Sequence, residues 1–397
     1  ALIRMLKNNL NLTSINLTDS FVELGGDSLS AITLIAEIEN KFHIQLHIKD
    51  LLTMSSILEI SDYISNTTSN AKVSYVTKAT PQEYYPLSSA QKRIYYACKI
   101  IGENSTIYNT PCALLIDSIL DADKVEKIFN KIIKKQTSFR TVFCLNNNEI
   151  KQKIVDNIEL SIPIFNNSES DIDKILQNFT KPFDLEKAPL IRIELHYLNN
   201  LKTLLLIDSH HIIVDGVSIN ILLNEFFSEY NNNSEEKIPL KYTDYAVWEN
   251  KYLESDEYKK NEDYWINRFK DYSFESLNLP YDYTIPANRT YIGEKISSSI
   301  SDDIFNSVSD IAKRFKISNY TVFLVALYIC LYKYTKQADI VIGSPVANRS
   351  MLKNNNIIGM FVNNLAFRAK ILPDQTVSKF LKYVNDLILQ DLDNQCY

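Results

Sequence analysis

The chain has 397 residues, enough for about two or three domains. Hydrophobic residues make up 45% of it and charged residues 23%, the proportions of a folded globular protein, so wholesale disorder is excluded. The 42 Lys and Arg residues are outnumbered by 48 Asp and Glu residues, which gives a formal net charge of −6. This balance lacks the basic surplus of a nucleic-acid-binding domain, and we expect no nucleic-acid partner.

Residues 1–66 contain no proline and predict a small helical domain. The segments 1–10, 28–42 and 57–64 repeat apolar residues at helical spacing. This periodicity is lost after residue 65, and Pro81 and Pro86 mark a new start. We therefore assign residues 67–84 to a linker.

From residue 85 onward, helical and strand patterns alternate, which predicts a mixed α/β domain large enough for two lobes. We expect helices at 121–135, 217–230 and 319–334, and strands at 140–144, 191–197 and 201–208. The helix at 319–334 is apolar almost all round and is expected to be buried. The strand at 201–208 is nearly continuously apolar, as expected for a strand buried on both faces.

The cysteines and the apolar runs indicate the cellular compartment of the protein. Five cysteines are scattered without a CxxC pair: Cys98, Cys112, Cys144, Cys330 and Cys396. We interpret them as buried thiols in a reducing compartment, with neither a disulfide frame nor a metal site. The longest apolar run, Val322 to Tyr332, is about half as long as a membrane span requires. No signal peptide opens the chain, so we expect a cytoplasmic piece of a longer protein, without a membrane partner.

The rare glycines direct attention to four short segments. Only seven glycines occur, and five of them fall within residues 24–28, 215–216, 342–345 and 358–360. In a chain so poor in glycine, we expect those that remain to stand where a side chain is not tolerated.

The first of these segments, Leu24-Gly25-Gly26-Asp27-Ser28, places a serine at the start of a predicted helix. Such a serine can be a simple N-cap. The whole string, within a small helical domain, resembles the modification site of acyl and peptidyl carrier domains. This resemblance covers residues 1–66 and implies a four-helix carrier, clipped at its N-terminus, whose Ser28 receives 4′-phosphopantetheine from a separate phosphopantetheinyl transferase. A phosphodiester at a helix N-terminus is favoured by the free amides and the helix dipole.

The second segment ends the buried strand with two adjacent histidines, in His210-His211-Ile212-Ile213-Val214-Asp215-Gly216. A single histidine there would indicate a core residue, but two histidines with Asp and Gly at fixed offsets favour a site. Imidazole has a suitable pKa for taking a proton near neutral pH. The string resembles the HHxxxDG motif of the chloramphenicol-acetyltransferase-like superfamily, which includes the condensation domains of non-ribosomal peptide synthetases.

This resemblance implies a role for each residue of the motif. His211 is the catalytic residue, either as a full base or chiefly by orienting the attacking amine, and His210 packs. Gly216 lets a backbone N–H approach the developing oxyanion. Asp215 is structural and pairs with a buried arginine, for which the matching position is Arg349.

Further segments match condensation domains in family order and extend the resemblance over residues 84–397. Among them are residues 85–93, 138–143, 182–190, 242–248, 343–349 and 358–364. Three of these contain Arg140, Trp248 and Asn363, which either line the substrate tunnel or pack in the core. The resemblance implies an N-lobe at about 85–255 and a C-lobe at about 256–397, the latter incomplete at its C-terminus.

Together, the two resemblances identify a fragment of a non-ribosomal peptide synthetase, a multienzyme of antibiotic and other secondary-metabolite biosynthesis. They imply that the carrier, loaded with the help of an upstream adenylation domain, holds an aminoacyl or peptidyl thioester. The condensation domain then forms an amide with an amine on a downstream acceptor carrier. The form of residues 182–190 and 209–218 favours an L-configured donor.

Other functions remain open on the sequence. Asp27 departs from the His that more often precedes the serine ahead of condensation domains, and it favours an epimerisation domain. Such a domain usually has a Trp-Arg pair shortly after HHxxxDG, where this chain has Val217 and Ser218. A heterocyclisation domain would replace the histidines with aspartates, and an inactive recruitment domain would typically lose the second histidine, here His211. A stand-alone acyltransferase is the remaining alternative.

Overall fold

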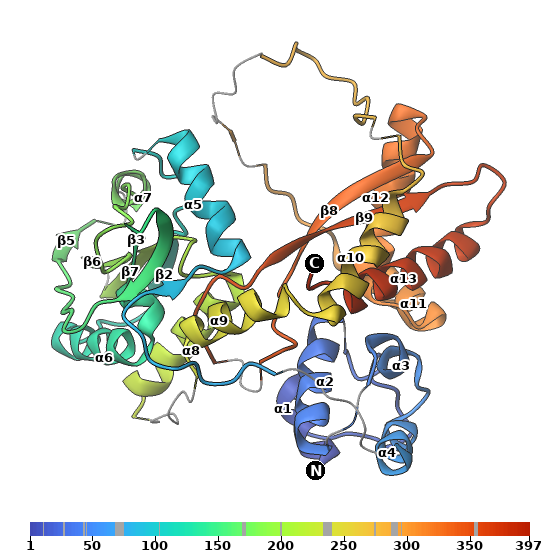
Figure 1. Ribbon diagram of the computed structural model, residues 1–397, viewed down its shortest axis with the longest axis horizontal. Helices are drawn as coiled ribbons and strands as arrows, with labels where there is room; N and C mark the ends of the chain where they lie inside the picture. Colours follow the sequence, from blue (N-terminus) through green and yellow to red (C-terminus); the bar gives the residue numbers. More distant parts are fainter. Residues whose placement is uncertain are drawn as a thin grey trace. The chain divides into compact units, whose positions relative to one another are not determined.

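The computed structural model describes residues 1–397 apart from 11, 27, 43, 45, 68–74, 103, 169–171, 199–200, 233–239, 274, 287–292, 295 and 353–355. Contacts divide the chain into two units (Figure 1). The first comprises residues 1–74, 260–353 and 363–397, and the second comprises residues 75–259 and 354–362. A short segment near the C-terminus thus belongs with the second unit, although the sequence assigned it to the C-lobe.

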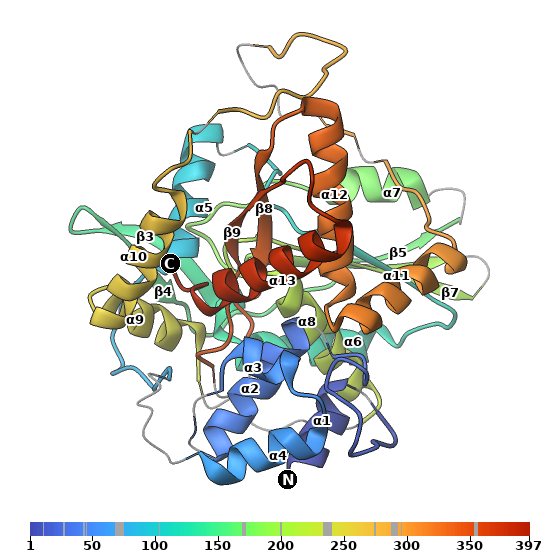
Figure 2. The same cartoon turned by 90° about the vertical axis from the view of Figure 1, so that its right-hand side faces the viewer.

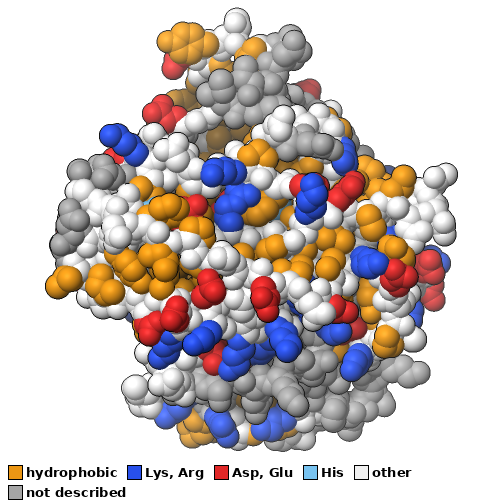
Figure 3. Space-filling model, turned by 90° about the vertical axis from the view of Figure 1, so that its left-hand side faces the viewer, with side chains coloured by type: hydrophobic (Ala, Val, Ile, Leu, Met, Phe, Trp, Pro, Cys, Tyr) orange, Lys and Arg blue, Asp and Glu red, His pale blue; other side chains and the backbone are white. Residues whose placement is uncertain are grey.

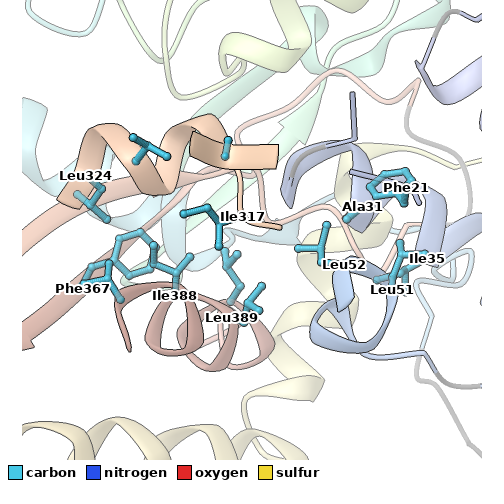
Figure 4. Close-up of a cluster of buried hydrophobic side chains, with 14 of the residues drawn as sticks. Phe21, Ala31, Ile35, Leu51, Leu52, Ile317, Leu324, Phe367, Ile388 and Leu389 are labelled. Atoms are coloured by element: carbon cyan, nitrogen blue, oxygen red, sulfur yellow. The ribbon is translucent and has the colours of Figure 1, made fainter. Parts of the chain in front are cut away.

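The N-terminal part of the first unit contains four helices, as expected for a carrier. They are α1 (Leu2–Leu10), α2 (Ser28–Phe42), α3 (Ile48–Thr53) and α4 (Ile57–Asn66). Phe21, Ala31, Ile35 and Leu51 are buried in its core (Figure 4). Helix α3 was not predicted, because its six residues are too few to show a helical period.

The rest of the first unit is a two-stranded sheet with helices packed against it. Its elements are α10 (Asp256–Phe269), α11 (Asp302–Phe315), α12 (Asn319–Thr335), β8 (Asp339–Val346), β9 (Asn363–Lys370) and α13 (Val377–Asp393). Strands β8 and β9 pair antiparallel from Asp339 opposite Lys370 to Val346 opposite Asn363. Figure 2 shows α13 crossing these strands, and Figure 4 shows Leu324, Phe367 and Ile388 in the core between them and the helices.

The prediction that the helix at 319–334 is buried was wrong for one of its faces. Val322, Val325 and Tyr328 are buried, whereas Leu327 is 44% exposed and Tyr334 is 68% exposed. The helix packs against its neighbours by only one face, so its all-round apolar character does not report its burial. Within the described residues, no single helix is long and apolar enough to cross a membrane. Helices α11 and α12, with a bend of 105° between them, are long and apolar enough only when they are taken together as a pair.

The prediction of buried thiols was also wrong. Cys330 on α12 is exposed, and Cys98, Cys112, Cys144 and Cys396 are half-buried. All five are free thiols. On the face of the molecule shown in Figure 3, side chains of both charges are interspersed with apolar ones.

The second unit is a mixed α/β structure built on two sheets. In chain order it contains β1 (Tyr85–Pro86), α5 (Ser89–Ile101), β2 (Cys112–Ile116), α6 (Ala122–Lys135), the 3-10 helix η1 (Thr137–Arg140), β3 (Thr141–Asn146), β4 (Glu149–Ile154), β5 (Ile164–Asn167), α7 (Ile172–Phe179), β6 (Ile191–Leu198), β7 (Lys202–Ser209), α8 (Gly216–Tyr230) and α9 (Tyr242–Tyr252). The sheets have the strand orders β1-β4-β3 and β2-β7-β6-β5.

Strand β7 has paired neighbours on both sides. It is antiparallel to β2 and to β6, and residues 203–209 are all buried. This confirms the prediction of a buried strand at 201–208 and places the two histidines directly beyond its end.

Candidate active site

The two histidines lie in a short connection between β7 and α8. His210 forms an isolated antiparallel bridge with Asn109, and the His211 N–H donates to the Tyr108 carbonyl at 2.7 Å. Helix α8 begins five residues later, at Gly216. The connection is therefore fixed by backbone hydrogen bonds at the histidines themselves and by the start of α8 after Asp215.

The ring of His211 is held in one tautomer. Its Nδ1 lies 2.8 Å from the Val214 carbonyl oxygen, which can only accept a hydrogen bond. Nδ1 must then carry the proton, and Nε2 of the neutral ring keeps its lone pair. Since His211 is only half-buried, this nitrogen is suited to take a proton from a substrate.

His210 is a packed, uncharged residue. It is 5% exposed, and its Nδ1 accepts the Ile212 N–H at 3.1 Å, which leaves the proton on Nε2, 3.7 Å from the Cys98 sulfur. Burial, followed by the neighbouring His211, lowers the pKa of His210 to about 4. The side chain is therefore neutral at pH 7 and lacks the accessibility of a catalytic group.

Asp215 organises the start of α8. It is fully buried, and its Oδ1 accepts the backbone N–H and the hydroxyl of Ser218, each at 2.7 Å. Its Oδ2 accepts the Phe361 N–H at 3.1 Å. The carboxylate therefore caps the helix and also binds the returning segment at 356–362.

Gly216 is the first residue of α8 and is exposed. A Cβ there would meet no atom within 4 Å, so the expectation that packing excludes a side chain was wrong for this glycine. The first amides of a helix have no acceptor within it. Gly216 therefore presents an unshielded backbone close to the histidines.

The sequence marked residues 358–364 as a family match, but it did not predict the contacts that the returning segment makes. The Ser218 hydroxyl accepts the Gly359 N–H at 3.0 Å, and the Gln136 side chain bonds the backbone of Asn356 and Ile358 at 3.0 and 3.2 Å. Gly359 itself confirms the glycine expectation, because a Cβ there would lie 1.9 Å from the Tyr242 ring.

The remaining predicted residues make hydrogen bonds or ring contacts within the protein. Arg140 donates to the carbonyl oxygens of Ile133, Lys134 and Val155 at 3.1, 3.2 and 2.7 Å. Trp248 stacks on Tyr245 and Tyr252 with centroid distances of 6.1 and 5.0 Å. Asn363 donates to the carbonyl oxygens of Gln395 and Tyr397 at 2.9 and 2.8 Å.

Arg349 is buried, at 3% exposed, in the first unit, whereas Asp215 belongs to the second. Their pairing stays a prediction. Within the part of the chain that the structure describes, no group of three or more His, Cys, Asp or Glu residues could hold a metal ion.

The serine that the sequence predicts to be modified is the first residue of a long helix. Ser28 is the first residue of the 15-residue α2, although its side chain and Asp27 lie outside what the structure describes. Gly25 has a φ of +91° and no atom within 4 Å of a Cβ position. The open position at Gly25 and the N-terminus of α2 fit a phosphodiester, because the first amides of a helix favour an anion.

Comparisons with known proteins agree with both motifs. The condensation-domain family matches residues 81–397, and the phosphopantetheine attachment site family matches residues 1–64. Gramicidin S synthase 2 of Aneurinibacillus migulanus is 34% identical over 390 residues, which is 98% of this chain and 9% of that protein. Surfactin synthase subunit 2 of Bacillus subtilis (strain 168) is 34% identical over 382 residues, which is 96% of this chain and 10% of that protein. The chain thus spans about a tenth of the length of these curated relatives.

Solved structures show the same fold. The X-domain in its complex with OxyB from teicoplanin biosynthesis has a TM-score of 0.72 at 18% identity, covering 81% of this chain and 73% of that one. The first condensation domain of the calcium-dependent antibiotic synthetase has a TM-score of 0.69 at 16% identity, covering 80% and 76%.

Proposed function

Since the chain belongs to the condensation-domain family of non-ribosomal peptide synthetases and carries a phosphopantetheine attachment domain, we propose that it forms an amide between a donor held on its own carrier and an amine presented by a downstream carrier. The observation that carries this proposal is the tautomer of His211, whose Nδ1 donates to the Val214 carbonyl and whose Nε2 remains an acceptor.

The reaction requires a proton acceptor, which is Nε2 of His211, and a hydrogen-bond donor for the oxyanion. The acceptor amine attacks the donor thioester carbonyl, and the new C–N bond forms as an amine proton passes to Nε2 of His211. The amide N–H at Gly216, at the start of α8, stabilises the oxyanion. The C–S bond then breaks, and the leaving thiolate takes the proton back from His211. The phosphopantetheine on Ser28 supplies the thiol that activates and tethers the donor.

We assign the carrier to residues 1–66, the linker to 67–84 and the condensation domain to 85–397, with lobes dividing near residue 255. An upstream adenylation domain loads the carrier, and a phosphopantetheinyl transferase modifies Ser28. An L-configured donor follows from the motif forms described above. The five free thiols support a cytoplasmic location.

The direct test follows dipeptidyl product by intact mass. The chain is loaded at Ser28 with an L-aminoacyl-phosphopantetheine and mixed with an aminoacylated acceptor carrier. We expect the mass of the acceptor carrier to rise by one aminoacyl unit with the wild-type protein. We expect the rate to fall about a hundredfold or more in His211→Ala, because a positioned general base contributes about that much.

The matched control is His47→Ala, which removes an exposed histidine of the carrier and should leave the rate unchanged. Product formation by His211→Ala at the wild-type rate would refute the mechanism. Inversion of the donor α-carbon without amide formation would instead identify an epimerase. A D-aminoacyl donor that reacts as fast as its L-enantiomer would refute the donor assignment alone.

A further inference from the structure

A buried carboxylate lies on β7, two residues before the first of the two histidines. This residue, Asp208, is fully buried. Its Oδ2 accepts the Asn109 side-chain amide at 2.7 Å and the Arg192 guanidinium at 3.0 Å. Asn109 lies just before β2 and Arg192 lies on β6, and these strands flank β7 on its two sides (Figure 1). The carboxylate therefore joins three neighbouring segments at the end of the strand that leads to the histidines.

The two donors also bind the segment that follows α7. The Asn109 amide donates to the Lys181 carbonyl at 2.8 Å, and the Arg192 guanidinium donates to the same oxygen. Arg192 also donates to the Pro182 carbonyl at 3.0 Å. Asn109 and Arg192 thus share two acceptors, the Asp208 carboxylate and the Lys181 carbonyl, and the four groups form a closed hydrogen-bonded cluster. We call it the Asp208 cluster.

The Asp208 cluster is connected to the reacting histidine through the backbone of residues 108–110. The backbone of Asn109 forms the bridge with His210, and the preceding carbonyl, of Tyr108, accepts the His211 N–H at 2.7 Å. The pairing of β2 with β7 therefore continues beyond the ends of both strands, as far as His211. A shift of Asn109 would move the carbonyl oxygen that fixes the His211 backbone.

A buried ion pair is not needed for stability, because apolar residues of similar volume often stabilise a fold equally well. Its hydrogen bonds are short and directional, so they define the positions of the groups that they join. We propose that Asp208 is a positioning residue for the reaction: through Asn109 it holds the Tyr108 carbonyl and thereby fixes His211 beside the substrates. Arg192 compensates the charge of the carboxylate. This inference rests on the proposed function, in which His211 takes the amine proton.

The first test breaks the connection without stranding a charge. Asn109→Ala removes the amide but leaves Asp208 paired with Arg192. We expect kcat of amide formation to fall about tenfold or more while KM for the acceptor carrier changes by less than about twofold, because a displaced base slows the chemistry and not the binding.

The matched control is Asn130→Ala on α6. The Asn130 amide also joins two segments, since it donates to the Leu160 carbonyl at 2.9 Å and accepts the Leu160 N–H at 2.8 Å. Its loss removes a comparable set of hydrogen bonds from the same unit and should leave kcat unchanged. An equal fall of kcat in both variants would show general destabilisation and would overturn the proposal.

The second test measures the backbone at His211 directly and needs no amide formation. The chain contains five histidines, so the full chain labelled with 15N-histidine gives few amide signals, and His211→Ala identifies the one of interest. In Asn109→Ala, exchange of the His211 N–H with deuterium should accelerate about tenfold or more relative to that of His196, which lies on β6 in the same unit. Asn130→Ala should leave this ratio unchanged.

Two double variants test Asp208 itself at equal charge. Asp208→Asn with Arg192→Met keeps an oxygen that can accept the Asn109 amide, whereas Asp208→Leu with Arg192→Met does not. We expect the first to keep kcat within about threefold of wild type, and the second to lose as much as Asn109→Ala.

Equal kcat in the two double variants would overturn the proposal, as would a wild-type kcat or an unchanged exchange ratio in Asn109→Ala. If the wild-type protein formed no amide, the proposed function would fail, and the exchange ratio would still decide whether the Asp208 cluster positions His211.

Discussion

At the scale of single residues, the two adjacent histidines differ in burial and in the access to their ring nitrogens. His211 is half-buried with its Nε2 free to act as an acceptor, whereas His210 is buried beside a neutral thiol. Consecutive side chains at the end of a strand point in different directions, so one can pack while its neighbour reacts. The sequence motif shows two histidines, but only the structure tells which of them is buried and which keeps an accessible ring.

The buried His210 makes stability depend on pH. Its pKa is lowered from 6.5 to about 4, so the unfolded chain binds its proton more readily than the folded one. This contribution to stability is complete above pH 6.5 and is lost as the pH falls towards 4. We expect His210 to remove about 2 kcal/mol of the free energy of unfolding of the second unit between pH 7 and pH 5.

The measurement compares urea unfolding of wild type and His210→Asn, whose amide oxygen can still accept the Ile212 N–H. Trp248 reports on the second unit in a Trp265→Phe background, because these are the two tryptophans of the chain. The variant should lose this part of the pH dependence. If the free energy of unfolding changed equally with pH in both proteins, burial would not keep His210 neutral.

At the scale of elements, the start of α8 and the returning segment depend on one carboxylate. Asp215 accepts hydrogen bonds from Ser218 and from Phe361, which is 146 residues distant. Asp215→Ala leaves these buried donors unsatisfied, and we expect it to lower the free energy of unfolding of the second unit by about 3 kcal/mol. Its solubility and activity should fall together.

Ser218→Ala removes the hydroxyl that accepts the Gly359 N–H and donates to Asp215, but it keeps the backbone N–H that Asp215 caps. It should cost about 1–2 kcal/mol in the same urea unfolding experiment. Because this variant keeps the helix cap, it measures the contribution of the Ser218 hydroxyl separately from that of Asp215. Loss of amide formation from a well-folded Asp215→Ala protein would contradict the structural role and indicate a direct catalytic one.

The glycine at 359 tests how tightly the returning segment packs. A Cβ there would lie 1.9 Å from the ring of Tyr242, so Gly359→Ala requires the segment or α9 to move. We expect a loss of about 2–3 kcal/mol in the free energy of unfolding, as for an overpacked core. Gly343→Ala is the control, since nothing lies within 4 Å of its Cβ position, and it should change stability by less than about 0.5 kcal/mol. Equal effects of the two substitutions would refute the packing argument.

What could be predicted from the sequence depended on the range of the interactions. Strand β7 and the helix after it follow from an apolar run and a local period, and the histidines were placed by their position between them. The contacts of the returning segment could not be predicted, because its bonds to Gln136 and Ser218 join residues more than a hundred positions apart. The exposed face of α12 was missed because hydrophobicity alone does not say which neighbours a helix has.

At the scale of the whole molecule, the proposed reaction separates delivery of the donor from the chemistry. Ser28 lies in the first unit and His211 in the second, 183 positions apart in the sequence. A carrier only tethers its thioester, so its contribution is an effective concentration and not a change in the reacting groups. Loss of tethering can therefore be compensated by free donor, whereas loss of the imidazole cannot.

This gives a prediction that distinguishes the two residues. Ser28→Ala should gain no mass with a phosphopantetheinyl transferase and should form no product from a carrier-bound donor. A soluble L-aminoacyl N-acetylcysteamine thioester, at high concentration, should restore amide formation on the acceptor carrier in Ser28→Ala but not in His211→Ala. Rescue of both variants would mean that the imidazole is dispensable. Rescue of neither would mean that the tethered arm contributes binding contacts as well as concentration, because a short thioester lacks the arm.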